Sequence, residues 1–244
     1  MTRLPAHIIA HRGDSAHAPE NSLAALDSAI AAGADRVECD VRIAGDGTLV
    51  VSHDADLSRI AGRSVLIDDT PAEELARTAA AAGASVLPLA TLFEAAHGRI
   101  PLMLDVKSLI PAVIEKIAAD LAAAAFDPRR IALGLRDPAL VGPARAHLPA
   151  ARILALNSGT TPVDAFLAES VDLIRLWERD ADADTIAALH GQGCTVWVTT
   201  GGTGTDREVG DCSTDDLSRL IAAGADGLLV NDPALGRRAV LSAA

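Results

Sequence analysis

Short runs of aliphatic and β-branched residues alternate along the whole chain with Ala-rich segments of helical spacing. Such runs, bounded by Gly, Pro and Asp, are typical of buried strands, and apolar residues three or four positions apart are typical of helices packed on a sheet. The pattern predicts eight strands, at residues 7–11, 36–43, 102–107, 131–135, 152–156, 172–176, 194–199 and 226–230.

No Ser/Gly/Pro-rich linker divides the chain, so residues 1–244 are predicted to form a single domain. Eight strands that alternate with helices indicate an α/β protein, and about 250 residues is the usual size of a (β/α)8 TIM barrel. We therefore predict that fold. Between the first two strands, Asn21 is expected to cap a helix that ends at Gly33.

An Asp-Gly turn follows the second predicted strand, and the apolar run 49–53 follows the turn. This pattern predicts a β-hairpin that extends the second strand at the rim of the barrel. With residues 45–48 as the loop, Asp40 lies opposite His53.

Polar residues gather at the predicted ends of the first three strands, where the chemistry of a barrel is located. Glu38 and Asp40 share one strand face because side chains alternate, and the residues between them are apolar. Asp105 and Lys107 repeat this alternation on the next barrel strand. Three carboxylates could converge on one ion, and oxygen ligands favour Mg²⁺ or Ca²⁺.

The composition argues against several classes of binding partner. The chain is 50% hydrophobic with a formal net charge of -12 and no Lys/Arg cluster, which argues against nucleic acid or an anionic membrane as a partner. No segment has the length of a membrane span or the pattern of a signal peptide. The three cysteines have neither disulfide nor zinc spacing, so a reduced, cytoplasmic protein is expected.

The chain resembles the glycerophosphodiester phosphodiesterase family, whose barrel plan is similar to that of the phosphatidylinositol phospholipase C barrels. The likeness is strongest over the first 107 residues and rests on an ordered series of motifs. They are His11-Arg12-Gly13, Pro19-Glu20-Asn21-Ser22, the segment 33–41, Asp46-Gly47, the segment 50–54 and Leu104-Asp105-Val106-Lys107, with Val196-Trp197 and Gly224-Ala225-Asp226-Gly227 near the C-terminus.

The resemblance implies metal-dependent hydrolysis of glycerophosphodiesters to glycerol 3-phosphate and an alcohol. It implies His11 and His53 as acid and base, and a divalent cation, Mg²⁺ or Ca²⁺, held by Glu38, Asp40 and Asp105. Which histidine is the acid stays open, and so does the choice between attack by water and attack by a glycerol hydroxyl that gives a cyclic phosphate. The oligomeric state is also open.

Three further residues are candidates for binding a small glycerophosphodiester. Arg12 could hold a phosphate oxygen through its planar fork, Lys107 could add a point charge, and Trp197 could line a pocket. Each also has a structural interpretation: Arg12 could pair with Asp14 or a helix end, Lys107 could balance Asp105, and Trp197 could be a core residue.

Three segments depart from the family pattern. Asp105 stands where the family usually has Glu, Gly134-Leu135-Arg136 where it often has a Ser-Phe pair, and Val198-Thr199-Thr200 lacks the usual asparagine. The alternatives are a phosphodiesterase for a lysophospholipid, a phosphoinositide or a sugar phosphodiester, or a barrel that binds a diester or metal without turnover. A lipid substrate would need exposed apolar rim loops, and none is evident in the sequence.

Overall fold

The computed structural model describes residues 5–156 and 163–243. Eight parallel strands form a closed ring in the order β1, β10, β9, β8, β7, β6, β5, β2, and β2 pairs back onto β1. The ring consists of β1 (His7–Ala10), β2 (Arg36–Ile43), β5 (Leu102–Val106), β6 (Ile131–Leu135), β7 (Arg152–Ala155), β8 (Leu173–Trp177), β9 (Thr195–Thr199) and β10 (Gly227–Val230). The predicted TIM barrel is confirmed, and each predicted strand is present to within two residues.

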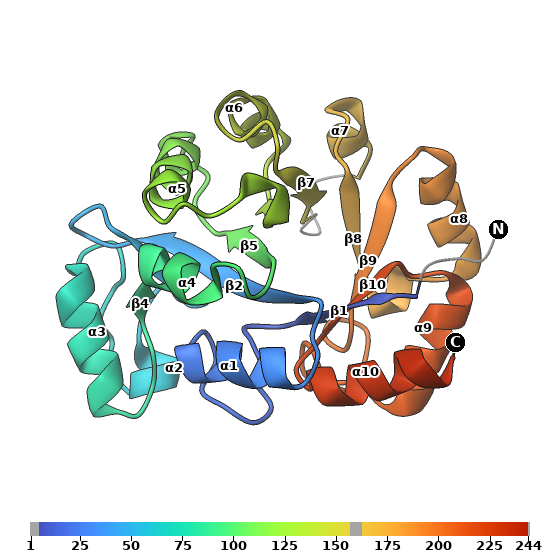
Figure 1. Ribbon diagram of the computed structural model, residues 1–244, viewed down its shortest axis with the longest axis horizontal. Helices are drawn as coiled ribbons and strands as arrows, with labels where there is room; N and C mark the ends of the chain where they lie inside the picture. Colours follow the sequence, from blue (N-terminus) through green and yellow to red (C-terminus); the bar gives the residue numbers. More distant parts are fainter. Residues whose placement is uncertain (1–4, 157–162, 244) are drawn as a thin grey trace.

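Helices surround the ring (Figure 1). They are α1 (Leu23–Ala31), α2 (Ser58–Ala61), α3 (Ala72–Ala81), α4 (Leu89–Ala96), α5 (Ala112–Ala123), α6 (Val141–His147), α7 (Val163–Ala168), α8 (Ala183–Gly191), α9 (Thr214–Ala223) and α10 (Pro233–Ser242). Short 3₁₀ turns lie at Pro128–Arg130, Pro138–Leu140 and Glu178–Asp180. No helix in the described part of the chain is long and apolar enough to cross a membrane.

The cap of α1 differs from the expectation. Ser22, not Asn21, is the N-cap, and its side chain accepts a hydrogen bond from the backbone N–H of Ala25. Asn21 takes a left-handed backbone conformation, with φ of 56°, and its side chain points into the barrel, where it donates to Asp40. Gly33, with φ of 79°, ends the helix as predicted.

Alternation along the strands creates two apolar layers. Outward residues such as Val37, Cys39 and Val41 pack in the main core cluster beneath the helices. Inward residues form a smaller cluster inside the barrel, made of Ile9, Met103, Ala132, Leu154, Leu156, Leu173, Trp197 and Leu229. This inner cluster fills the barrel and leaves polar residues at its carboxyl end.

The predicted hairpin is present, but its register is one residue off. β3 (Leu49–Val51) pairs antiparallel with β2, Ile43 opposite Leu49, and β4 (Leu87–Pro88) pairs with β3. The turn takes one residue more than expected, because the N–H of Ala44 bonds to the carbonyl of Thr48 at 2.9 Å. Ser52, whose N–H donates to the carbonyl of Asp40, therefore lies opposite Asp40 in place of His53.

Candidate active site

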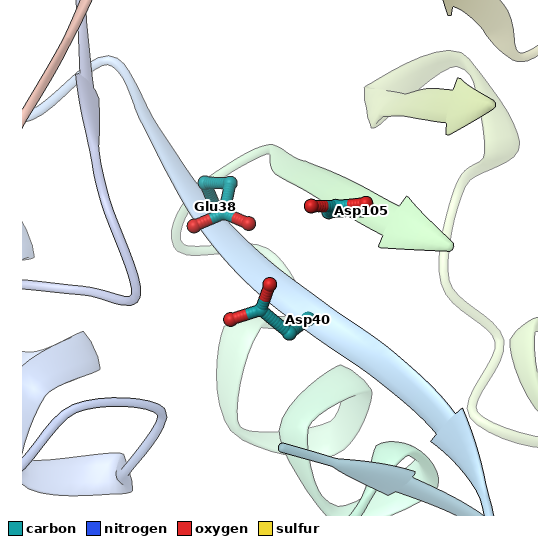
Figure 2. Close-up of side chains that lie close together, drawn as sticks. All are labelled: Glu38, Asp40 and Asp105. Carbon is teal, nitrogen blue, oxygen red and sulfur yellow. The ribbon is translucent and has the colours of Figure 1, made fainter. Parts of the chain in front are cut away.

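Three carboxylates meet at the carboxyl end of the barrel. Asp40 on β2 and Asp105 on β5 are partners in the parallel register, and Glu38 lies two residues before Asp40 on the same inward face. Figure 2 shows the three side chains directed toward one another. One ligand oxygen from each lies within 4.8 Å of the others, and all three residues are buried.

Cationic side chains surround these carboxylates. The Lys107 Nζ lies 2.7 Å from Asp40 and 2.6 Å from Asp105, and the Arg12 Nε lies 3.3 Å from Asp40. Arg136 donates to both oxygens of Asp105, at 2.9 and 2.6 Å. Burial opposes the ionisation of Asp40, but Lys107 and Arg12 outweigh it and hold the pKa of Asp40 well below its ordinary value.

Glu38 is the carboxylate whose charge is least compensated. It accepts a hydrogen bond from the backbone N–H of Arg12 at 2.9 Å. Burial, together with the neighbouring Asp40 and Asp105, raises the pKa of Glu38 well above its ordinary value. A divalent cation among these oxygens would remove that penalty, and an all-carboxylate donor set suits a hard ion such as Mg²⁺ or Ca²⁺. The residues present therefore fit such an ion.

His53 reaches the cavity from the loop after β3, and not from a strand position. Its backbone carbonyl accepts two hydrogen bonds from Arg42, at 3.0 and 2.8 Å, which fix the loop. Its Nδ1 lies 2.8 Å from Asp54, and its side chain is 37% exposed. Burial, with Lys107 and other charges, lowers the pKa of His53, whereas the bond to Asp54 opposes that shift.

His11 follows β1, lines the same cavity and is buried. Its Nδ1 is 2.8 Å from the Oδ1 of Asn231, just after β10. The Nδ2 of Asn231 donates to the carbonyl of Val209 and to Asp211, both at 2.9 Å, so its Oδ1 must accept. The hydrogen of neutral His11 is therefore on Nδ1, which leaves Nε2 as an acceptor. Burial and the nearby Arg12 lower the pKa of His11 to about 4.

The turn after β1 places Arg12. Arg12 has a left-handed φ of 55°, and Gly13 follows with φ of 83°. A Cβ on Gly13 would lie 2.6 Å from the Cβ of Ala25 on α1, so only glycine fits this close approach. The guanidinium of Arg12 also contacts Glu20, at 3.2 Å. Asp14, the alternative partner of Arg12, instead contacts His17, at 2.8 Å.

The two histidines, the three carboxylates, Arg12 and Lys107 all line one cavity of about 740 Å³. It extends from the two histidines, past the carboxylates, to residues at the ends of β6, β8 and β9, among them Arg136, Arg175, Trp177 and Thr199. Of the eight residues predicted for the site, the structure thus brings together His11, His53, Arg12, Lys107, Glu38, Asp40 and Asp105.

The prediction that Trp197 lines the pocket is wrong, because Trp197 is not on the cavity wall. It is 3% exposed and belongs to the inner apolar cluster, three members of which line the cavity. Its ring is covered by Arg36, whose guanidinium carbon is 5.6 Å from the ring centroid. Trp197 sits too early on β9 to reach the cavity, and Thr199, two residues later on the same face, reaches it instead.

Sequence reasoning missed Asn231, Arg175 and Trp177. The signal that could have found them is the one that found Glu38 and Asp40: polar residues spaced by two at the end of an apolar strand. Arg175 and Trp177 alternate with the outward Ile174 and Leu176 in β8. The hydrogen bond from Asn231 to His11 connects residues 220 positions apart and had no local signal.

Comparison with known proteins agrees with the fold and the site. Residues 11–235 match the model of the glycerophosphoryl diester phosphodiesterase family. A glycerophosphodiester phosphodiesterase from Caldanaerobacter subterraneus is 28% identical over 93% of this chain and 94% of the relative. A probable glycerophosphodiester phosphodiesterase 1 from Mycobacterium tuberculosis is 58% identical over a shorter stretch, 21% of this chain and 19% of the relative.

Solved structures share the barrel. A putative glycerophosphodiester phosphodiesterase from Galdieria sulphuraria has a TM-score of 0.85 at 18% identity, covering 99% of this chain and 100% of that one. A phosphodiesterase from Oleispira antarctica, in complex with its product sn-glycerol-3-phosphate, has a TM-score of 0.80 at 22% identity, covering 97% of each chain.

Fold, cavity and relatives define the class: this is a (β/α)8-barrel enzyme that hydrolyses phosphoric diesters. Because the family match covers nearly the whole barrel, the class can be narrowed. The chain belongs to the glycerophosphoryl diester phosphodiesterase family.

Proposed function

We propose that this enzyme hydrolyses glycerophosphodiesters to glycerol 3-phosphate and an alcohol, with a divalent cation on Glu38, Asp40 and Asp105. The observation that carries this proposal is the presence of two imidazoles and a buried carboxylate trio in a single cavity. A phosphodiester needs its charge neutralised, an attacking hydroxyl deprotonated and a leaving oxygen protonated. When bound, the ion supplies a Lewis acid for a phosphoryl oxygen.

His11 is the proton acceptor in this proposal. Asn231 holds the hydrogen on Nδ1, so Nε2 can take a proton from the attacking hydroxyl group. Burial keeps the imidazole neutral near neutral pH, because its pKa is lowered to about 4. A neutral, rigidly held imidazole is suited to act as a base from the start of the reaction.

His53 is the proton donor. Its Nδ1 contacts Asp54, and a carboxylate there stabilises the imidazolium form. Asp54 is itself oriented by Arg59, whose Nε lies 2.6 Å away. The partial exposure of His53 lets it recover a proton from solvent after each turnover.

Arg12 and Lys107 complete the charge balance. Both line the cavity, and both contact Asp40. In the proposed reaction they stabilise the phosphoryl oxygens as negative charge builds up on them. The product named for the Oleispira antarctica phosphodiesterase, sn-glycerol-3-phosphate, is the product proposed here.

The test is the release of glycerol 3-phosphate from glycerophosphoglycerol, glycerophosphoethanolamine and glycerophosphocholine, with Mg²⁺, Ca²⁺ or a chelator. Release that needs the ion and is lost in both His11→Ala and His53→Ala supports the proposal. A folded protein that binds the ion and releases nothing from any of the three diesters contradicts it.

A lysophospholipid is a second candidate substrate, because the rim is more apolar than the sequence suggested. Leu109 and Ile110, just after β5, are 57% and 61% exposed. Ile110 lines a second cavity of about 290 Å³ with Ile43 and Ile67, and Lys107 lines both cavities. An acyl chain in this cavity could therefore leave its phosphate near the carboxylates. Release of lysophosphatidic acid from lysophosphatidylcholine, reduced by Ile110→Glu, is the test.

A further inference from the structure

Glu178 is a buried carboxylate that has no part in the reaction proposed above. It follows β8 directly, is 4% exposed and does not line the cavity. Its Oε2 accepts a hydrogen bond from the backbone N–H of Gly201 at 2.8 Å. Its Oε1 accepts from Arg207 at 2.8 Å and from Arg219 at 2.6 Å. Both oxygens of this carboxylate are therefore occupied by donors from residues 23 or more positions further along the chain.

Two of these donors belong to the loop between β9 and α9, residues 200–213. Gly201 lies near the start of the loop and Arg207 in its middle, so Glu178 holds the loop at two separate points. Gly201 has a φ of 62°, and a Cβ on it would overlap the backbone carbonyl of Glu208. The two halves of the loop therefore pack directly against each other, and fixing one half also fixes the other.

The second half of the same loop holds Asn231. The N–H of Gly210 donates to the carbonyl of Thr200, and the carbonyl of Gly210 accepts from the N–H of Asn231, both at 2.8 Å. The side-chain amide of Asn231 donates to the carbonyl of Val209 and to Asp211. Gly210 has a φ of 88°, and a Cβ on it would overlap the amide oxygen of Asn231, so only glycine allows this approach. Three consecutive loop residues thus set the position of the amide.

We propose that Glu178 is a positioning residue for His11 and acts through the loop 200–213 and Asn231. This inference rests on the proposed function, in which His11 accepts the proton and the amide oxygen of Asn231 keeps the imidazole hydrogen on Nδ1. When the loop loses its contacts with Glu178, the groups that orient the amide are no longer fixed. His11 then lacks a fixed acceptor for its Nδ1 hydrogen, and its Nε2 is no longer held ready to take a proton.

Glu178→Gln tests the proposal because it keeps the shape of the side chain. An amide has one acceptor oxygen and an NH₂ group that only donates, so either Gly201 or the guanidinium groups would face a donor in place of an acceptor. We expect kcat for glycerophosphoglycerol to fall about tenfold, with a smaller change in KM. The nitrogen chemical shifts of His11 should show a new population with the hydrogen on Nε2. A purely structural role would lower the melting temperature without changing the tautomer.

Arg207→Gln and Arg219→Gln form a matched pair of controls. Both arginines donate to the same oxygen of Glu178 and both pair with Asp216, but Arg207 belongs to the loop whereas Arg219 lies on α9. Arg207→Gln should lower kcat and change the tautomer of His11 in the same direction as Glu178→Gln. Arg219→Gln should keep the wild-type kcat and tautomer, even where it lowers the melting temperature. If Glu178→Gln does not fold, this pair carries the test.

The double variant Glu178→Gln/Asn231→Ala shows whether Glu178 acts through Asn231. If it does, Glu178→Gln should cause no further loss of kcat once Asn231 is alanine. Losses that multiply in the double variant overturn this inference, and so do a wild-type kcat and tautomer in Glu178→Gln; both results leave the proposed function standing. A wild-type protein that releases no glycerol 3-phosphate overturns the proposed function, and the tautomer of His11 in Glu178→Gln then still tests the link.

Discussion

The surroundings of His11 and His53 differ although both imidazoles border the same cavity. His11 is 7% exposed and contacts a neutral amide, Asn231, whose orientation is fixed by two further hydrogen bonds. The His53 side chain is 37% exposed and contacts a carboxylate, Asp54, which belongs to a chain of ion pairs through Arg59 and Glu20. Both contacts raise the pKa of the imidazole, and a charged acceptor such as Asp54 stabilises imidazolium more than a neutral amide does.

The difference shows how one cavity can supply both a base and an acid. Burial lowers the pKa of both imidazoles, to about 4 for the buried His11, whereas the hydrogen bond to Asp54 opposes the shift at the more exposed His53. In the proposed reaction His11 is therefore the base and His53 the acid. The following experiments test the proposed roles of His11 and His53.

The largest effect is expected from removing each histidine. Both His11→Ala and His53→Ala should lower kcat by about 10²–10⁴-fold, the usual contribution of one general acid or base. A diester with a nitrophenolate leaving group needs no protonation, so it should restore much of the rate of His53→Ala and none of that of His11→Ala. Measured rates for the two substrates decide the assignment; rescue of His11→Ala would reverse it.

A smaller loss is expected from Asn231→Ala. Without the amide, His11 is free to rotate and to place its hydrogen on Nε2, so kcat should fall about 10–100-fold while KM changes little. The nitrogen chemical shifts of His11 report its tautomer directly. An Asn231→Ala protein with the wild-type tautomer and a reduced kcat would contradict the role given to Asn231.

Asp54→Asn should change the pH dependence more than the maximal rate. Losing the carboxylate lowers the pKa of His53, because the hydrogen bond that His53 donates to Asp54 raises it. His53 then loses its proton at a lower pH, so the alkaline limb of the kcat/KM profile should move to lower pH. The acidic limb, which follows His11, should stay in place.

The smallest expected effect is on thermal stability and comes from Glu38, one of the three site carboxylates. Glu38 has a raised pKa in the folded protein. Its ionisation therefore lowers the free energy of unfolding as the pH rises above the ordinary pKa of a glutamate. At pH 7, metal-free Glu38→Gln should therefore melt about 2–4 °C above the metal-free wild type, which corresponds to roughly 1 kcal/mol. At low pH, where Glu38 is protonated, the two proteins should melt at the same temperature. Mg²⁺ or Ca²⁺ should raise the melting temperature of the wild type and not of the variant.

Much of this site could be predicted from local patterns. Glu38 and Asp40 were placed on one face by alternation alone, and the barrel brought Asp105 beside them because parallel neighbours end together. The register of the hairpin could not be predicted, since the turn contains one residue more than its Asp-Gly signal indicates. His53 reaches the cavity because Arg42 binds its carbonyl.

The sequence by itself determined the elements, because apolar spacing of two or three to four residues is a local property that burial on one face requires. It also determined the order of the motifs along the chain. Only the tertiary structure decided which inward residues stand at the same height in the barrel. That height depends on strand register around the closed ring, so it places Trp197 in the apolar layer and Arg175 and Trp177 at the cavity. The partners of His11 and His53 were decided in the same way, by contacts that no local pattern encodes.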